Sequence, residues 1–157
     1  MKNGEPKSIT FVHTPENFLA ETQQYGAMFM PVWAYTLASY IEHPENYDLN
    51  LCDLRFEKAN DIAEADIFAF SGVNQDYESI IDAERQLRAR FPNSTFIIGG
   101  PIAWSLNQAG EFDKLNMFDH VFVGDGEEAF PEFIKAFSRR SNLPKLIETT
   151  KRFDVAK

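Results

Sequence analysis

The sequence predicts an α/β fold built on a parallel sheet, and two observations support that prediction. Short apolar segments that end in glycine recur along the chain: residues 67–72 read IFAFSG, residues 96–101 read FIIGGP and residues 121–127 read VFVGDGE. Continuous apolar strands are typical of a parallel sheet that is buried on both faces. The segments between them have helical periodicity, and strands that alternate with helices form parallel sheets through right-handed crossovers.

Five strands are predicted, each a short run of apolar and β-branched residues bounded by turn-forming residues. They cover residues 8–13, 47–53, 66–71, 95–98 and 120–123. With helical segments between them the pattern is (βα)5, which is typical of a flavodoxin-like or Rossmann-like sheet. We therefore expect five parallel strands in the order 2-1-3-4-5, with helices on both faces of the sheet.

Helices are predicted where apolar residues recur at helical spacing. The first covers residues 31–42, with Pro31 at its first position, where a missing N–H is not needed. The second covers residues 77–91 and buries a stripe of apolar side chains. Its opposite face is expected to be solvated. That face carries Glu84, Arg85, Arg88 and Arg90.

Two more helical segments follow. One covers residues 102–109, and the last begins near Glu127, because Pro131 fits only the first turn of a helix. Beyond residue 140 the sequence becomes more basic and loses its period. We therefore predict one α/β domain over residues 1–140, and a tail or linker toward an absent domain over residues 141–157.

Charge and composition exclude several classes of partner. The net charge is −9 and the pI is about 4.8, so the chain lacks the clustered Lys and Arg that nucleic acids and anionic membranes require. No stretch approaches the roughly 18 apolar residues of a membrane helix. The N-terminus does not resemble a signal peptide. The single cysteine, Cys52, allows no intramolecular disulfide and is expected to be a small core residue. These features predict a cytoplasmic protein.

The glycines at the strand ends predict a ligand site. In a parallel α/β sheet, ligands bind at the carboxyl ends of the strands, and glycine lets a backbone approach a flat ligand closely. The loops at that edge are residues 14–30, 71–76, 99–104 and 124–127. The alternative is that these glycines only form tight turns between strands and helices. Their occurrence on three strands favours a site.

Several common motifs are absent. No G-x-G-x-x-G follows the first strand, and neither a P-loop nor a G-x-S-x-G elbow is present. His13, His43 and His120 lack the spacing of metal ligands. The sequence therefore predicts no catalytic residue and no metal ligand in this chain.

Four segments in order resemble the cobalamin-binding domain at the N-terminus of many radical SAM enzymes. They are residues 31–41 (PVWAYTLASYI), 66–71 (DIFAFS), 91–101 (FPNSTFIIGGP) and 119–127 (DHVFVGDGE). The similarity covers roughly residues 8–137 and includes the closing G-x-G-E turn.

The resemblance implies a Rossmann-like domain that holds cobalamin, with the corrin over the strand ends and the nucleotide tail in a cleft beside the sheet. The positions that match the family's binding loops are Ser71, Gly72, Gly99, Gly100, Pro101, Gly124, Gly126 and Glu127. The Asp-x-His-x-x-Gly motif is absent, so cobalamin would be bound base-off and without a histidine ligand. The chain also departs from the family pattern at Trp33, where glycine is frequent, and at Ile102, where histidine is frequent.

A radical SAM centre needs three cysteines to hold its [4Fe–4S] cluster, and this chain has one. We therefore expect no iron–sulfur cluster here and no catalysis by this chain alone. The chain is either part of a longer enzyme or a domain that works with a radical SAM partner in cis or in trans. Two alternatives remain open: a cofactor-free interaction domain that packs Trp33 and residues 28–30 against a partner, and a small flavin- or nucleotide-binding protein.

Overall fold

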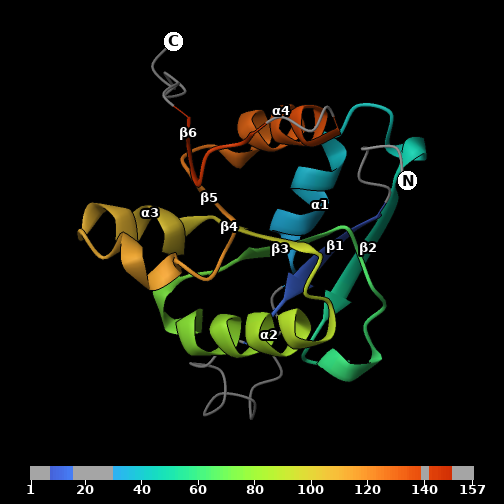
Figure 1. Cartoon of the computed structure of the whole chain (residues 1–157), viewed down its shortest axis with the longest axis horizontal. Helices are drawn as coiled ribbons and strands as arrows, with labels where there is room; N and C mark the ends of the chain where they lie inside the picture. The colour runs from blue at the N-terminus through green and yellow to red at the C-terminus, as the bar shows by residue number, and fades with distance from the viewer. Residues whose placement is uncertain (1–7, 16–29, 139–141, 150–157) are drawn as a thin grey trace.

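The computed structural model describes residues 8–15, 30–138 and 142–149, and over these the chain forms a parallel sheet with helices on both faces (Figure 1). The strands are β1 (Ser8–His13), β2 (Asp48–Asp53), β3 (Ile67–Ser71), β4 (Thr95–Gly99), β5 (His120–Val123) and β6 (Leu146–Glu148). The α-helices are α1 (Val32–Ser39), α2 (Tyr77–Arg90), α3 (Pro101–Gln108) and α4 (Gly126–Ser138). The predicted start of the last helix near Glu127 is confirmed, but the prediction that Pro131 lies in its first turn is wrong, because Pro131 lies inside α4. Among the described residues, no helix combines the length and the apolar character needed to cross a membrane.

The strand order is β2-β1-β3-β4-β5-β6, and all the strand pairs are parallel. The predicted order 2-1-3-4-5 is confirmed for the first five strands. The prediction of only five strands is wrong, because residues 146–148 of the expected tail pair with β5. Leu146 packs against the core on one face of the sheet and Ile147 against the core on the other. Where the domain ends remains a prediction.

Alternating side chains divide the core between the two faces of the sheet. In β3, Phe68 and Phe70 face α2 and α3, whereas Ile67 and Ala69 face α1 and α4. Each of these four side chains is almost fully buried. Figure 1 shows α1 and α4 above the sheet and α2 below it. The continuous apolar strands are explained by this burial on both sides.

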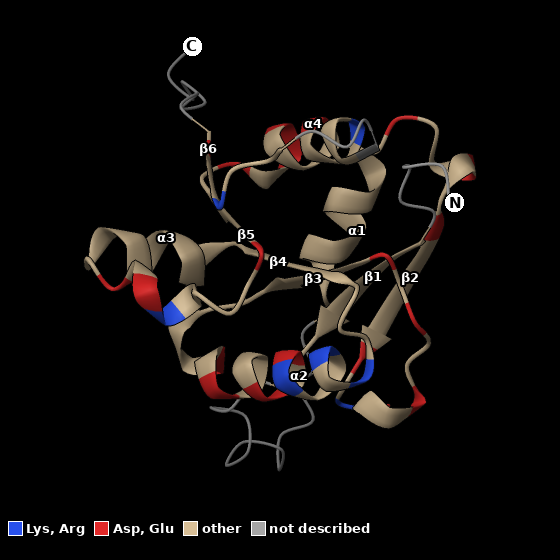
Figure 2. Ribbon diagram, viewed as in Figure 1, with Lys and Arg blue, Asp and Glu red and all other residues tan. Residues whose placement is uncertain are grey.

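The outer face of α2 is less solvated than the sequence predicts. Charged residues of both signs follow one another along this helix (Figure 2). Arg85 and Arg90 are exposed, but Glu84 is only 4% exposed and Arg88 is partly covered. The prediction of a wholly solvated face is therefore wrong for Glu84 and Arg88, because this part of the helix faces the chain that leads into β5.

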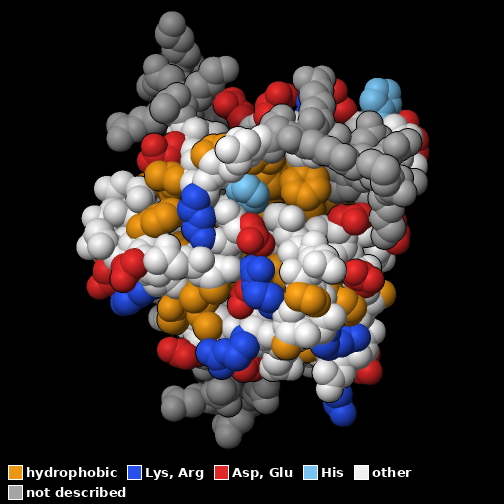
Figure 3. All heavy atoms as spheres, in the orientation of Figure 1, with side chains coloured by type: hydrophobic (Ala, Val, Ile, Leu, Met, Phe, Trp, Pro, Cys, Tyr) orange, Lys and Arg blue, Asp and Glu red, His pale blue; other side chains and the backbone are white. Residues whose placement is uncertain are grey.

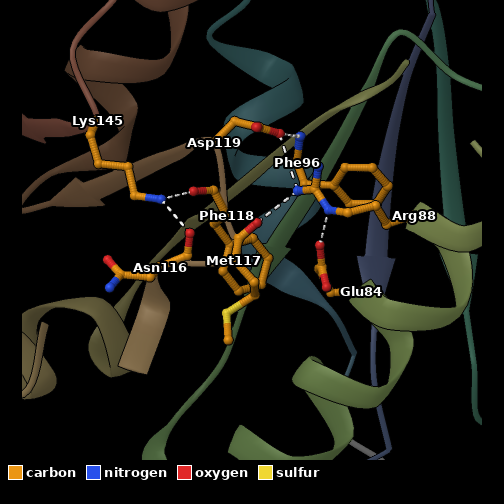
Figure 4. Close-up of polar contacts among 8 residues, drawn as sticks. All are labelled: Glu84, Arg88, Phe96, Asn116, Met117, Phe118, Asp119 and Lys145. Carbon is orange, nitrogen blue, oxygen red and sulfur yellow. Dashed lines mark hydrogen bonds and ion pairs between the residues drawn. The ribbon is translucent and has the colours of Figure 1, made fainter. Parts of the chain in front are cut away.

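Arg88 connects α2 to the sheet (Figure 4). Its guanidinium donates to the Glu84 carboxylate, to the Met117 carbonyl at 2.7 Å and to Asp119 Oδ2 at 3.2 Å. It also lies 4.3 Å from the centre of the Phe96 ring. Asp119 Oδ2 in turn accepts the Phe96 backbone N–H at 2.7 Å. A half-buried cation is thus matched by two carboxylates, a carbonyl and an aromatic face, as a charge in this position requires.

Lys145 fixes the chain just before β6 to the same region. Its Nζ donates to the Asn116 carbonyl at 2.8 Å and also to the Phe118 carbonyl (Figure 4). Partial burial of the ammonium group lowers the pKa of Lys145. These contacts hold the last described segment against the loop before β5, which places β6 at the edge of the sheet.

Cys52 lies in β2 as a core residue, 3% exposed, with its thiol donating to Glu57 Oε2 at 3.3 Å. Burial, together with the Glu57 carboxylate, raises the pKa of the thiol to about 12. Because only the thiolate reacts quickly, we expect the native protein to resist Ellman's reagent at pH 8. The same protein should release about one equivalent of thionitrobenzoate per chain once unfolded in guanidinium chloride. Rapid reaction of the native protein would contradict this assignment.

Candidate functional site

A cavity of about 610 Å³ lies at the carboxyl ends of β3, β4 and β5, on the face of the sheet covered by α1 and α4. Its apolar floor includes Ala69, Ile97 and Phe122, one residue from each of these three strands. Side chains of α1 and α4 and the start of α3 complete its wall. Its volume lies within the roughly 300–1,000 Å³ of typical small-molecule sites.

The structure brings together seven of the eight residues that the resemblance singled out. They are Ser71, Gly99, Gly100, Pro101, Gly124, Gly126 and Glu127, all of which line this cavity. The strand register explains the convergence, because Ser71 pairs directly with Gly99 and β5 runs alongside β4. The eighth residue, Gly72, lies outside the lining.

Gly72 is explained by packing. A Cβ placed there would lie 2.8 Å from Ile80 Cδ1 and 2.9 Å from Asp76 Oδ2. The Gly72 carbonyl accepts the backbone N–H of Ile102 at 2.9 Å, which ties the loop after β3 to the start of α3. Gly72 therefore does not line the cavity, but its carbonyl holds the start of α3, which forms part of the cavity wall.

Two lining glycines are required by the fold itself. Gly100 has a φ of 80° and Gly124 a φ of 107°, a region that other residues rarely adopt. A Cβ on Gly100 would overlap Ser71 Oγ, and one on Gly124 would overlap Thr149 Oγ1. The tight-turn explanation of these glycines and the ligand-site explanation are therefore compatible, since the same close approach leaves the strand ends free of side chains.

Both tryptophans of the chain line the cavity. Trp33 packs edge-on against Phe11, with ring centroids 5.9 Å apart, and its Nε1 is buried without a hydrogen bond to the described part of the chain. Trp104 is 56% exposed. Neither is among the predicted site residues, although Trp33 departs from the family pattern. The sequence contains a signal for Trp104, because this residue ends the predicted loop 99–104 at the ligand-binding edge of the sheet.

The charged side chains that line the cavity are acidic. Among its described lining residues, only Asp125 and Glu127 are charged, and none is Lys, Arg or His. The wider surface does not offset this charge with a basic patch on the face shown in Figure 3, where Lys and Arg lie among acidic and hydrophobic side chains. The described lining residues therefore offer no side-chain cation to an anionic ligand.

The three histidines lie away from this cavity lining. His13, at the end of β1, is buried, and its pKa is lowered by burial and by the nearby Arg55 cation. His43 is exposed in a turn, and His120 lies 2.7 Å from the Pro144 carbonyl through Nδ1. Within the part of the chain that the structure describes, no group of three His, Cys, Asp or Glu side chains is placed to hold a metal ion.

A charged pair lies at the carboxyl end of β2, which β1 separates from the strands of the cavity. Arg55 donates to both carboxylate oxygens of Asp53, with a shortest distance of 2.6 Å. Burial would raise the pKa of Asp53, but the hydrogen bonds and charge of Arg55 outweigh it and lower the pKa. Residues 16–29, which form most of the predicted 14–30 loop, lie outside the described residues.

No protein-family model matches this chain, and no curated protein matches it. The interpretation of the site therefore depends on its own geometry.

Proposed function

We propose that this domain binds cobalamin, as the accessory domain of radical SAM methyltransferases and related enzymes does, and presents it to a partner catalytic domain. The observation that supports the proposal is the convergence of three glycine-containing strand ends on one cavity. The glycines at the strand ends predict a site of this kind from the sequence alone. Because β3, β4 and β5 are parallel and in register, the loops that follow these three strands meet at one edge of the sheet.

The residues present fit a large flat cofactor. Gly99, Gly100 and Gly124 leave the rim low, and the floor below them is apolar. A corrin ring offers a broad, flat face that suits a rim without large side chains. Cobalamin is larger than the cavity, so one part of it would occupy the cavity while the rest lay outside, over the strand ends.

The chain's own residues would bind and orient the cofactor. No histidine lies among the described lining residues, which supports binding without a histidine ligand. The glycine loops after β3, β4 and β5 would set the height of the cofactor above the sheet, and α1 and α4 would hold its inserted part. When bound, cobalamin supplies the cobalt centre on which methyl transfer or radical chemistry depends. The iron–sulfur cluster would belong to a partner domain.

The test is a titration of the purified protein with hydroxocobalamin, followed by desalting and visible absorbance. We expect about one retained cobalamin per chain. Thr36 lies on α1 within the lining and is half-buried, so Thr36→Trp should fill the cavity and reduce retention by at least about tenfold. Tyr35→Trp is the matched control, because Tyr35 is the neighbouring residue, 55% exposed and outside the lining. Absence of retention by the folded wild type would contradict the proposal.

An interaction domain without a cofactor is the second candidate, and exposed apolar side chains favour it. Val32 and Trp104 line the cavity but are 60% and 56% exposed, and Tyr35 is exposed on the same helix as Val32. Exposed apolar groups of this kind often mark contact sites for other proteins. In that case the folded protein would retain no cobalamin, and Val32→Ser and Trp104→Ser would weaken binding to a partner domain.

A further inference from the structure

We infer that the cavity selects its ligand by charge: it takes an uncharged or cationic planar ring system and excludes a phosphate group. The inference depends on the proposal that this cavity is a ligand site, but not on that ligand being cobalamin. Three sets of observations support it: the lining side chains, the charges at the rim and the state of the backbone N–H groups at the helix N-termini.

The lining side chains suit a planar ring. Trp33, Phe122 and Phe130 contribute aromatic rings, and Leu37 and Ile97 contribute aliphatic groups. The glycines of the strand ends place no side chain across the opening. Burial of an apolar ring against such surfaces is favourable in proportion to the area removed from water.

The charged rim opposes a phosphate. Asp125 and Glu127 both line the cavity, and Glu128 lies in the same first turn of α4. A phosphate monoester carries close to two negative charges at neutral pH, and no lining Lys, Arg or His is among the described residues to pair with it. Like charges a few ångströms apart repel one another, even close to water.

At the N-termini of α1 and α3, backbone N–H groups that could bind a phosphate are already used inside the protein. In phosphate-binding loops, free backbone N–H groups point at the anion. At the start of α3, Pro101 has no N–H, Ile102 donates to the Gly72 carbonyl at 2.9 Å and Ala103 to the Gly100 carbonyl at 3.1 Å. Two of the first donors of α3 are therefore already used inside the protein.

At the start of α1, backbone N–H groups are likewise already hydrogen-bonded within the protein. Pro31 has no N–H, the Val32 N–H donates to the Met30 carbonyl at 2.7 Å, and the Ala34 N–H donates to the Pro31 carbonyl at 3.0 Å. At α4 the acidic side chains of the first turn already complement the helix dipole. At α1 and α3, therefore, several of the N–H groups that would point at an anion in a nucleotide site are absent or already used.

This selectivity separates cobalamin from flavin nucleotides and mononucleotides. Cobalamin carries one phosphodiester, with a single negative charge, in the linker between its corrin and the base of its nucleotide tail. With that base in the cavity and the corrin over the strand ends, the phosphodiester would lie at the mouth of the cavity, in contact with water. A flavin or purine mononucleotide that inserted its phosphate would meet the two carboxylates directly. The small flavin- or nucleotide-binding alternative is therefore disfavoured at this cavity.

Riboflavin and flavin mononucleotide are the probes that test the inference, because they share one planar ring system and differ only in a phosphate. We expect equilibrium dialysis at low salt to show that riboflavin binds at least about tenfold more tightly than flavin mononucleotide. In the Asp125→Asn/Glu127→Gln variant the ratio should fall below about threefold, since the repulsion is removed. Quenching of tryptophan fluorescence, in the wild type and in Trp104→Phe, should localise riboflavin to the cavity, and Thr36→Trp should abolish its binding.

Three results would overturn the inference. They are no binding of riboflavin, binding of flavin mononucleotide as tight as that of riboflavin, and a preference for riboflavin that survives in the double variant. The proposed function is tested separately by cobalamin retention. Cobalamin retention without a preference for riboflavin would reject only the charge selectivity. A preference for riboflavin without cobalamin retention would reject only the proposed cofactor.

Discussion

Replacing Gly100 with alanine is expected to destabilise the folded protein by about 3 kcal/mol. Gly100 has φ 80° and ψ −167°, a combination that is essentially restricted to glycine. The added Cβ would also overlap Ser71 Oγ and lie 3.4 Å from Ser71 Cβ, and Ser71 is fixed by its place at the end of β3. Backbone strain and a steric clash therefore act together at the junction of β4 and α3. The measurement is urea-induced unfolding followed by far-UV circular dichroism.

Gly110→Ala is the matched control for this prediction. Gly110 also has a positive φ, 71°, but a Cβ there would meet nothing within 4 Å. Only backbone strain should remain, worth about 1 kcal/mol. Equal destabilisation by the two substitutions would show that the contact with Ser71 contributes nothing. Because Gly100 substitutions are expected to destabilise the domain, Thr36→Trp is the better test of ligand binding.

Replacing Arg88 with methionine is expected to destabilise the protein by about 3 kcal/mol. The substitution leaves the Glu84 carboxylate, which is 5% exposed, without its cation, and removes the donor to the Met117 carbonyl. Removing one partner of a buried ion pair is costly because the remaining charge stays away from water. The double variant Glu84→Leu/Arg88→Met should recover most of the lost stability, since it removes both charges.

Arg85→Met tests whether the effect depends on this network. Arg85 lies on the same helix, three residues earlier, and is exposed. Its replacement should change the free energy of unfolding by less than about 0.5 kcal/mol. If Arg88→Met and Arg85→Met gave equal values in urea titrations, the network of Figure 4 would contribute nothing to stability.

The close packing at Gly100 and Gly124 and the proposed site share one edge of the sheet. Gly100 and Gly124 allow β3, β4, β5 and the segment after β6 to meet without intervening side chains. The same arrangement leaves the cavity that α1 and α4 wall. The stability of this edge and its ability to take a flat ligand therefore have a common cause.

The sequence by itself determined the elements whose patterns are local. The first and fifth strands have the predicted limits, and α2 begins at the predicted Tyr77. Runs of apolar residues between turn-forming residues are sufficient for this because both faces of the sheet are buried. The convergence of residues 71, 99–101 and 124–127 was also predictable, since parallel strands end at the same edge.

Only the tertiary structure decided the features that depend on distant partners. The strand Leu146–Glu148 is too short to show a period, and it exists because β5 offers it an edge and because each face of the sheet has a core for its side chains. Glu84 and Arg88 have the spacing of a solvated helical pair, yet they are covered because Met117 and Asp119 lie beside α2. The place of Trp33 and Trp104 in the cavity wall likewise depends on how α1 and α3 sit against the strand ends. Whether a charge or an aromatic ring is buried depends on residues that are distant in the sequence, so the local sequence cannot predict it.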